Sequence, residues 1–78
     1  SQNVVTAEIV GRAAHAGLEP EKGLSALLIA AEILCRLPLG RIDDETTANI
    51  GWMEGGLKRN IIPELAFLDG DLLSICNE

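Results

Sequence analysis

The 78-residue sequence predicts a small α+β domain in which an antiparallel sheet carries one helix on one face. Three segments have the composition or the alternation of strands, and one segment between the first two has helical periodicity. Glycines and prolines separate these segments. The predicted order is therefore strand, helix, strand, strand, and a chain of this length forms a single domain with a thin core.

The first strand and the helix lie in the N-terminal half of the chain. Residues 3–10 (NVVTAEIV) are rich in β-branched side chains, which is typical of a half-buried strand. Pro20 suits a first helical turn, because the N–H that proline lacks would have no partner there. We expect the helix to continue to about Leu37, where Pro38 ends it.

The predicted helix is apolar on two sides, with a narrow polar stripe between them. At about 100° per residue, the apolar arc that we expect to face the sheet consists of Leu24, Leu27, Leu28, Ala31, Leu34 and Cys35. A second arc consists of Ala26, Ile29, Ala30, Ile33 and Leu37. A short chain covers only one of these arcs, so we expect the second to face a partner surface.

The second and third strands follow the helix. Residues 45–54 (ETTANIGWME) alternate, which places Asn49 and Trp52 on opposite faces of the sheet. The glycine pair at 55–56 supplies the positive φ angles that a tight reversal needs. Residues 65–73 (LAFLDGDLL) then form the third strand.

Composition argues against several classes of function. A net charge of −6 without a basic patch disfavours nucleic acid and anionic membranes as partners. The apolar stretch 24–39 is too short and too polar to span a bilayer, and the N-terminus does not resemble a signal peptide. Cys35 and Cys76 form no metal or disulfide motif, so we expect reduced thiols and a cytoplasmic protein.

The loop GRAAHAGLEPEKG (11–23) contains His15, the single histidine of the chain. A zinc site needs three or four converging ligands, and nearby Glu19 belongs to the start of the helix, so we expect no metal site in this segment. Cys35 on the predicted buried arc is a poor nucleophile. From the residues alone, the sequence predicts a small α+β interaction module in which His15 and Asn49 have no assigned role.

Three stretches in register carry a resemblance to a known family: GRAAHAGLEPEKGLSAL, LPLGRIDDETTANIG and GGLKRNIIPELAFLDGDLLS. Together they resemble the lid, or dimerisation, domain of the aminoacylase and carboxypeptidase-type zinc exopeptidases, above all the peptidase T-like branch. The resemblance implies a ferredoxin-like β-α-β-β-α-β layer whose third strand lies between the first two. Residues 1–78 then correspond to a partial lid, ending before the second helix and the fourth strand, and the catalytic domain lies outside them.

The resemblance also assigns roles to individual residues. His15 matches the lid histidine that reaches the active site, in dimeric members that of the other subunit, and helps to hold the scissile carbonyl oxygen. Asn49 matches a polar position that contacts the substrate, and Asn60 belongs to a structural turn, N-[IV]-[IV]-P. The chain departs from the family at residues 58–59 (Lys-Arg), which replace small residues, and at Leu73, which replaces an arginine.

The function implied by the resemblance is the hydrolysis of short peptides by a zinc-dependent exopeptidase. Two zinc ions are expected in the missing catalytic domain and none in this segment, which by itself is predicted to be inactive. We expect a homodimer formed through Ile29, Ile33, Leu37 and the edge of the second strand. The alternative is a non-catalytic, ferredoxin-like dimerisation or regulatory module.

Overall fold

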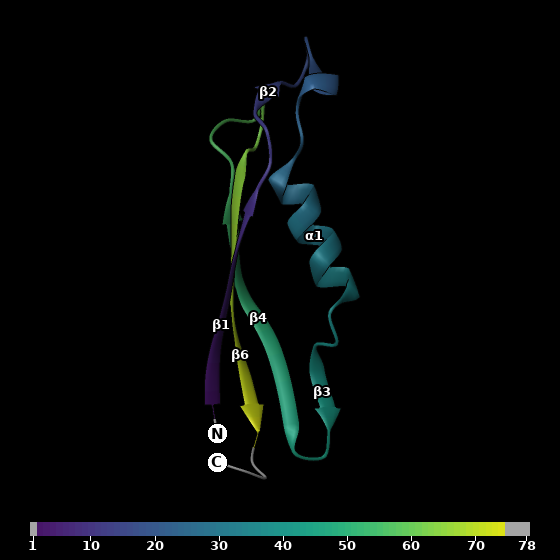
Figure 1. Ribbon diagram of the computed structural model, residues 1–78, viewed down its shortest axis with the longest axis vertical. Coiled ribbons are helices and arrows are strands. Elements are labelled where there is room, and N and C mark those ends of the chain that lie inside the picture. Colours follow the sequence, from purple (N-terminus) through teal and green to yellow (C-terminus); the bar gives the residue numbers. More distant parts are fainter. Residues whose placement is uncertain (1, 75–78) are drawn as a thin grey trace.

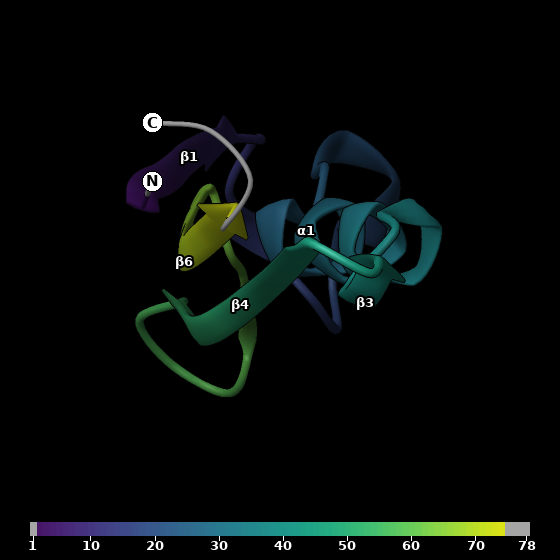
Figure 2. The same ribbon diagram turned by 90° about the horizontal axis from the view of Figure 1, so that it is seen from below.

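The protein forms an antiparallel sheet with a helix on one face and a small two-stranded sheet at one end (Figures 1 and 2). The structure is a computed structural model that describes residues 2–74. Its elements in chain order are β1 (Gln2–Val10), β2 (Ala14–His15), the 3₁₀ turn η1 (Pro20–Lys22), α1 (Ala26–Arg36), β3 (Gly40–Asp43), β4 (Thr46–Gly55), β5 (Ile61–Ile62) and β6 (Leu65–Ser74). The predicted α+β class is confirmed.

The main sheet has the strand order β1-β6-β4-β3, and all of its pairs are antiparallel. The predicted third strand, β6, therefore lies between the first strand, β1, and the second, β4, as expected. The register places Ile9 opposite Ala66 and Asn49 opposite Asp71. Because residues directly opposite share a face, this register decides which side chains lie beneath the helix.

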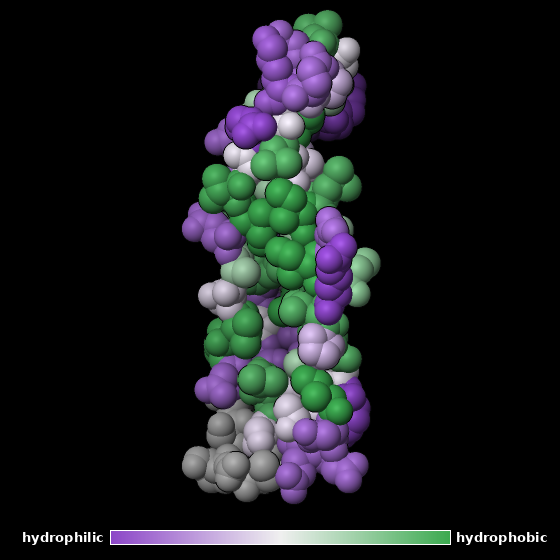
Figure 3. Space-filling view, turned by 45° about the vertical axis from the view of Figure 1, so that its right-hand side comes forward, coloured by the Kyte–Doolittle hydropathy of each residue, from purple (hydrophilic) through white to green (hydrophobic). Residues whose placement is uncertain are grey.

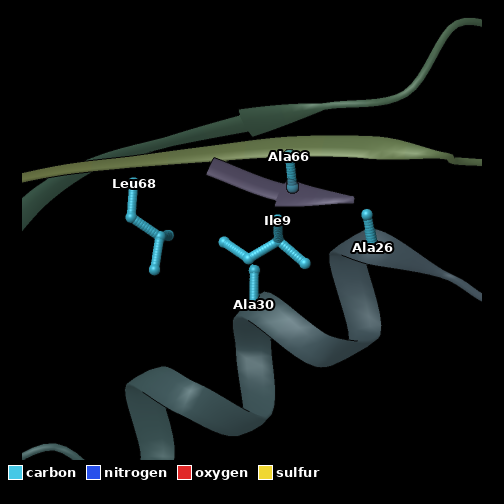
Figure 4. Close-up of a cluster of buried hydrophobic side chains, with 5 residues drawn as sticks. All are labelled: Ile9, Ala26, Ala30, Ala66 and Leu68. Atoms are coloured by element: carbon cyan, nitrogen blue, oxygen red, sulfur yellow. The ribbon is translucent and has the colours of Figure 1, made fainter. Parts of the chain in front are cut away.

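The core lies where α1 crosses the end of the main sheet that is nearer to the small sheet (Figure 1). Its buried side chains are Ile9, Ala26, Ala30, Ala66 and Leu68. Figure 4 shows the two helix alanines pointing at the sheet, with the Ile9 side chain between the layers. Ala26 and Ala30 lie one turn apart, so their small side chains let the helix backbone approach the strands closely. The core is thin, as the chain length predicts.

The expectation for the helix face that contacts the sheet is wrong in part. Leu28 is 72% exposed and Cys35 is also exposed, although both were expected to face the sheet. Ala26 and Ala30, expected on the partner side, are fully buried. Helical periodicity identified both apolar arcs. It did not show that the small alanine side chains, which allow the helix to approach the sheet closely, lie at the centre of the contact.

The structure also shows which flank of α1 lies next to the edge of β4. Ile29 and Ile33, expected to contact a partner, and Leu27 and Leu34, expected to face the sheet, all pack partly buried against the core. On the other flank, Leu27 Cδ1 lies 3.8 Å from the place where a Cβ would stand on Gly56, directly after β4. Leu34 shares the Leu27 flank by helical spacing. The side of the helix that adjoins the β4 edge is therefore the one with Leu27 and Leu34.

The helix begins later than predicted. Pro20 starts the separate turn η1, and the N-cap of α1 is Ser25, whose Oγ accepts a hydrogen bond from the backbone N–H of Leu28 at 3.2 Å. Between them, Leu24 pairs with Arg12 through two backbone hydrogen bonds of 2.8 Å. This pairing holds the backbone extended, so a continuous helix from Pro20 cannot form. The predicted end near Leu37 is confirmed.

The sequence did not reveal β3. This short strand forms a hairpin with β4, in which the Asp43 carboxylate accepts a hydrogen bond from the N–H of Glu45 at 2.9 Å. It pairs with β4 only from Thr46 to Ala48. In the part of the chain that the structure describes, no strand pairs with the outer edge of β4 from Asn49 onward.

The reversal after β4 also differs from the expectation. Only Gly56 of the glycine pair has a positive φ, +97°. The chain does not return directly to β6 but first passes through the loop 57–60 and β5. The predicted tight hairpin is therefore wrong, because residues 61–62 are used to pair with β2.

The helix covers only part of its sheet face. With about 1.5 Å of rise per residue, α1 is about 16 Å long, whereas the ten residues of β4 extend about 33 Å. Beyond the helix lies an apolar groove of about 200 Å³, lined by residues that include Val5, Leu39, Ile42 and Leu72. Figure 3 shows hydrophobic side chains along the middle of this face. Neither helix among residues 2–74 has the length and hydropathy to cross a membrane.

Candidate functional site

Two connecting segments, residues 11–25 and 56–64, form a compact unit at one end of the sheet, which we call the head (Figure 1). Inside it, β2 pairs with β5, so that His15 lies opposite Ile61. The backbone N–H of Gly11 donates to the carbonyl oxygen of Glu64 at 2.8 Å, which ties the head to the ends of β1 and β6. His15 therefore lies in a segment whose backbone is held in place by hydrogen bonds.

The ring of His15 is held by its own loop. Its Nδ1 accepts hydrogen bonds from the backbone N–H groups of Gly17 at 3.1 Å and of Leu18 at 3.2 Å. The His15 carbonyl oxygen accepts another from the N–H of Glu19 at 2.9 Å. These contacts fix the position of the imidazole although the residue is exposed.

This geometry selects one tautomer of the histidine. Because Nδ1 accepts two hydrogen bonds, the neutral ring carries its proton on Nε2. No described residue accepts a hydrogen bond from Nε2. His15 therefore offers an oriented N–H donor to an oxygen atom of a ligand.

Asn49 lies on the face of the sheet opposite α1, which we call the open face. On β6 this face carries Phe67, Asp69, Asp71 and Leu73, while Ala66 and Leu68 on the alternate positions are buried beneath the helix. The side-chain amide of Asn49 is exposed and makes no hydrogen bond to a described residue. The predicted orientation, away from Ile50 and the helix, is confirmed.

A β-bulge changes the predicted position of Trp52. Ile50 pairs with Gly70 but Trp52 pairs with Asp69, so Gly51 is the extra residue of β4. Trp52 therefore lies on the open face with Asn49, not on the opposite face as alternation predicted. It is 59% exposed, and its Nε1 donates to Oε1 of Glu54 at 3.1 Å.

His15 and Asn49 do not meet within one copy of the chain. Gly55 lies six positions after Asn49 along β4, which corresponds to about 20 Å at the usual rise per residue. His15 lies beyond that end of the strand, in the head. A single copy of this segment therefore does not bring both side chains to one bond of a small substrate.

Two further positions from the sequence analysis lie close to these residues. Leu73, where an arginine was expected, lies opposite Thr47 on the open face and is 39% exposed. The backbone carbonyl of Asn60 accepts a hydrogen bond from the N–H of Ala16 at 3.0 Å. The turn that contains Asn60 therefore supports the loop that carries His15.

A cavity of about 540 Å³ lies beside the head. It is lined by residues that include the apolar Ile61, Pro63 and Phe67 and the acidic Glu54 and Glu64. No pattern along the sequence predicts this cavity, because its walls come from β4, β5, β6 and the loops beside them, which meet only in the folded chain.

The acidic, histidine and cysteine side chains of residues 2–74 are dispersed over the fold. No three histidine, cysteine or acidic side chains in that range lie close enough to hold a metal ion. The pKa of Asp43 is below its usual range, chiefly because its carboxylate accepts the hydrogen bond from Glu45, and also because it accepts one from the Thr46 side chain. Asp43 lies in the β3–β4 turn, distant from His15. Cys76 lies outside the described residues.

Comparison with known proteins places this arrangement in a family. The model of the peptidase dimerisation domain matches residues 4–78. This chain belongs to the peptidase dimerisation domain family. The resemblance stated from the sequence is therefore confirmed, and so is its fold.

Solved relatives of this dimerisation domain include two peptidases. The aminopeptidase PepT from Bacillus cereus is 50% identical with a TM-score of 0.93, over 97% of this chain and 20% of that one. A tripeptidase from Staphylococcus aureus is 41% identical with a TM-score of 0.89, over 94% of this chain and 19% of that one. The protein YqjE of Bacillus subtilis is 58% identical over 62 residues, which are 80% of this chain and 17% of YqjE. The dimerisation domain thus spans about a fifth of these proteins.

Proposed function

We propose that this dimerisation domain is the lid of a cytoplasmic, zinc-dependent exopeptidase that hydrolyses short peptides, similar to peptidase T. The observation that carries the proposal is the imidazole of His15, whose Nδ1 is occupied by two backbone N–H groups and whose Nε2–H is free to donate. The likeness to an aminopeptidase and a tripeptidase supports a peptide as the substrate.

In this proposal His15 is a catalytic residue that donates from Nε2 to the carbonyl oxygen of the scissile peptide bond. That oxygen gains negative charge in the transition state, so the hydrogen bond becomes stronger as the reaction proceeds. The loop fixes the ring before the substrate arrives, and little reorganisation is needed. Small neighbours on both sides, Ala14 and Ala16, allow close approach to a second surface.

Asn49 has a different role in the proposal. Its exposed amide carries both a donor and an acceptor, which suits the backbone of a peptide substrate. Because about 20 Å of strand separates Asn49 from the end of β4 next to the head, one copy cannot apply both residues to one bond. A dimer in which the head of one subunit reaches the active site of the other removes this difficulty.

The dimer is proposed to form along the outer edge of β4, beyond the region that β3 covers. An exposed strand edge offers N–H and C=O groups to a second copy, and two-fold pairing of this edge joins the two sheets. The helix surface beside that edge is the flank with Leu27 and Leu34. Leu27 and Leu34 pack partly buried against the core, as Ile29 and Ile33 of the predicted surface do, so this flank is proposed because it adjoins the free edge of β4.

The zinc ions belong to the part of the protein outside this segment. The described residues provide no cluster that fits a metal ion, so both metals implied by the resemblance would be bound by a separate catalytic domain. What this domain contributes is independent of them: it orients an N–H donor and forms a subunit contact.

The proposal is tested on the complete protein that carries this domain. Short peptides are supplied, and the release of free amino acids is measured with and without a zinc chelator. We expect hydrolysis that the chelator abolishes and added zinc restores. A complete protein that dimerises but hydrolyses no peptide would instead be the non-catalytic association module.

A further inference from the structure

The positive charges of this acidic chain are concentrated in the head. The sequence contains twelve acidic and six basic residues. Four of the basic residues lie within the head, namely Arg12, Lys22, Lys58 and Arg59. The open face of the sheet carries mainly acidic charge, from residues that include Glu54, Asp69 and Asp71. The head is therefore the region of this chain that favours an anionic ligand.

Four of the six basic side chains of the sequence already have partners. Lys22 Nζ lies 3.1 Å from Glu19 Oε2, and Arg12 Nε donates to the carbonyl oxygen of Lys22 at 3.3 Å. Outside the head, Arg36 pairs with a glutamate one helical turn away, and Arg41 donates to backbone oxygens of its turn.

Lys58 and Arg59 differ from the other four. Neither side chain makes an ion pair or a hydrogen bond with any residue from 2 to 74, and both residues are exposed. Within the described chain they are the two basic residues whose side chains make neither an ion pair nor a hydrogen bond.

The backbone places this pair beside His15. The N–H of Ile61 donates to the carbonyl oxygen of Lys58 at 3.2 Å, which closes a turn with Arg59 and Asn60 at its corner. Ile61 pairs with His15, and the carbonyl of Asn60 accepts from the N–H of the residue after His15. Two adjacent loops of one hydrogen-bonded frame therefore carry the imidazole donor and the two cations.

We propose that Lys58 and Arg59 bind a carboxylate of the peptide whose scissile carbonyl contacts His15. The proposal rests on the proposed function and adds a substrate preference to it. A guanidinium can hold a carboxylate with two parallel N–H donors, and an ammonium adds a second positive charge. In a chain with a net charge of −6, a local pair of cations also attracts an anionic substrate to the place where it is needed.

The neighbouring acidic groups do not neutralise the pair. Glu19 is held by Lys22, and Glu54 accepts the hydrogen bond from Trp52 on the sheet face. Glu21 and Glu64, the other acidic residues of the head, make no ion pair with either cation. The carboxylate could be the C-terminus of a short peptide or an acidic side chain, because both present the same chemistry.

The test measures the kinetics of the complete protein and of its Lys58→Gln/Arg59→Gln variant on four tripeptides. The first pair is trialanine and its C-terminal amide, and the second pair consists of amidated tripeptides that differ only by glutamate or glutamine at one position. We expect the variant to lose about tenfold in kcat/KM, mainly through KM, on the substrate with the recognised carboxylate only. The matched control, Arg36→Gln, removes an exposed charge from the helix. It should leave the kcat/KM of each substrate relative to its uncharged counterpart unchanged.

The pattern of loss identifies the source of the carboxylate. A loss confined to trialanine assigns the C-terminus, and a loss confined to the glutamate peptide assigns a side chain; either supports the proposal. An equal loss on all four substrates, or no loss on any, overturns it. If the wild-type protein hydrolyses none of the four, the proposed function fails and this inference fails with it.

Discussion

Replacing His15 by alanine tests the central argument about the site. The substitution removes the imidazole but no core side chain, because His15 is exposed and lies in the head. In the complete protein we expect a large loss of kcat with little change in stability. The two effects can be estimated separately from the contacts of the ring.

The catalytic loss follows from the Nε2–H donor. Removal of one preorganised donor to a developing oxyanion typically lowers kcat by about 10² to 10³, or roughly 2.7 to 4 kcal/mol. The structural loss is smaller. Nδ1 accepts from Gly17 and Leu18, and water can replace an exposed acceptor, so the two hydrogen bonds together contribute about 1 kcal/mol or less to stability.

Two further variants separate the donor from the loop. In His15→Asn, the side-chain oxygen can accept the same backbone N–H groups as Nδ1, because asparagine forms this type of local turn readily. It has no donor at the position of Nε2, so kcat should fall nearly as far as in the alanine variant. His15→Gln places an amide N–H closer to that position and should retain more activity.

The assay is steady-state hydrolysis of a tripeptide, with thermal unfolding of each variant measured in parallel. A His15→Ala protein with unchanged kcat would reduce His15 to a surface residue. Full activity in His15→Asn would contradict the assignment of Nε2 as the donor. To test action across the dimer, His15→Ala subunits are mixed with subunits that lack a metal ligand of the catalytic domain; partial return of activity is expected, and verified heterodimers without any would exclude it.

The remaining predictions concern the interface, the sheet and the hairpin. Ala31→Glu places a charge on the helix flank beside the free edge of β4, so sedimentation of the complete protein should show weaker dimerisation, whereas Val4→Glu on the open face should have no effect. Gly70→Ala should lower the free energy of unfolding by about 1 to 3 kcal/mol in urea titrations, because a Cβ there would overlap the β4 backbone. Gly51→Ala, which meets only a flexible side-chain amide at 3.3 Å, should cost clearly less, and equal losses would contradict the packing argument. The lowered pKa of Asp43 means that its charged form stabilises the fold above the unfolded-state pKa of about 4, and that this contribution is lost as the pH falls through the folded-state value. Asp43→Asn should therefore lower the melting temperature at pH 7 but not at pH 2, and an equal difference at both pH values would refute the assignment.

Local sequence patterns were sufficient for most elements. The β-branched run at 3–10 and the alternating segment 65–73 became β1 and β6 nearly at their predicted bounds, because strand propensity and alternation are properties of short segments. Pro38 fixed the end of the helix for a similar reason. The family, its strand order and the candidate role of His15 came from motifs that can be read along the chain.

Contacts between distant segments decided the rest. The N-cap of α1 is Ser25 and not a residue near Pro20, because Leu24 pairs with Arg12. Helix propensity depends on residues that are close in sequence, so it takes no account of this pairing. Likewise, the close packing of the two layers decided which side of the helix faces the sheet: Ala26 and Ala30 are buried in the core, and of the predicted arc only residues such as Leu27 and Leu34 pack against it.

The open face shows the same limit at the candidate site. Alternation predicts the face of Asn49 correctly, but one extra residue at Gly51 moves Trp52 to the other side, because a bulge exists only relative to the paired strand. The sequence by itself determined which residues could carry chemistry. Only the tertiary structure decided that the His15 ring presents Nε2, that the turn containing Arg59 lies beside it, and that Asn49 lies elsewhere on the sheet, since each depends on hydrogen bonds or pairing in the folded chain.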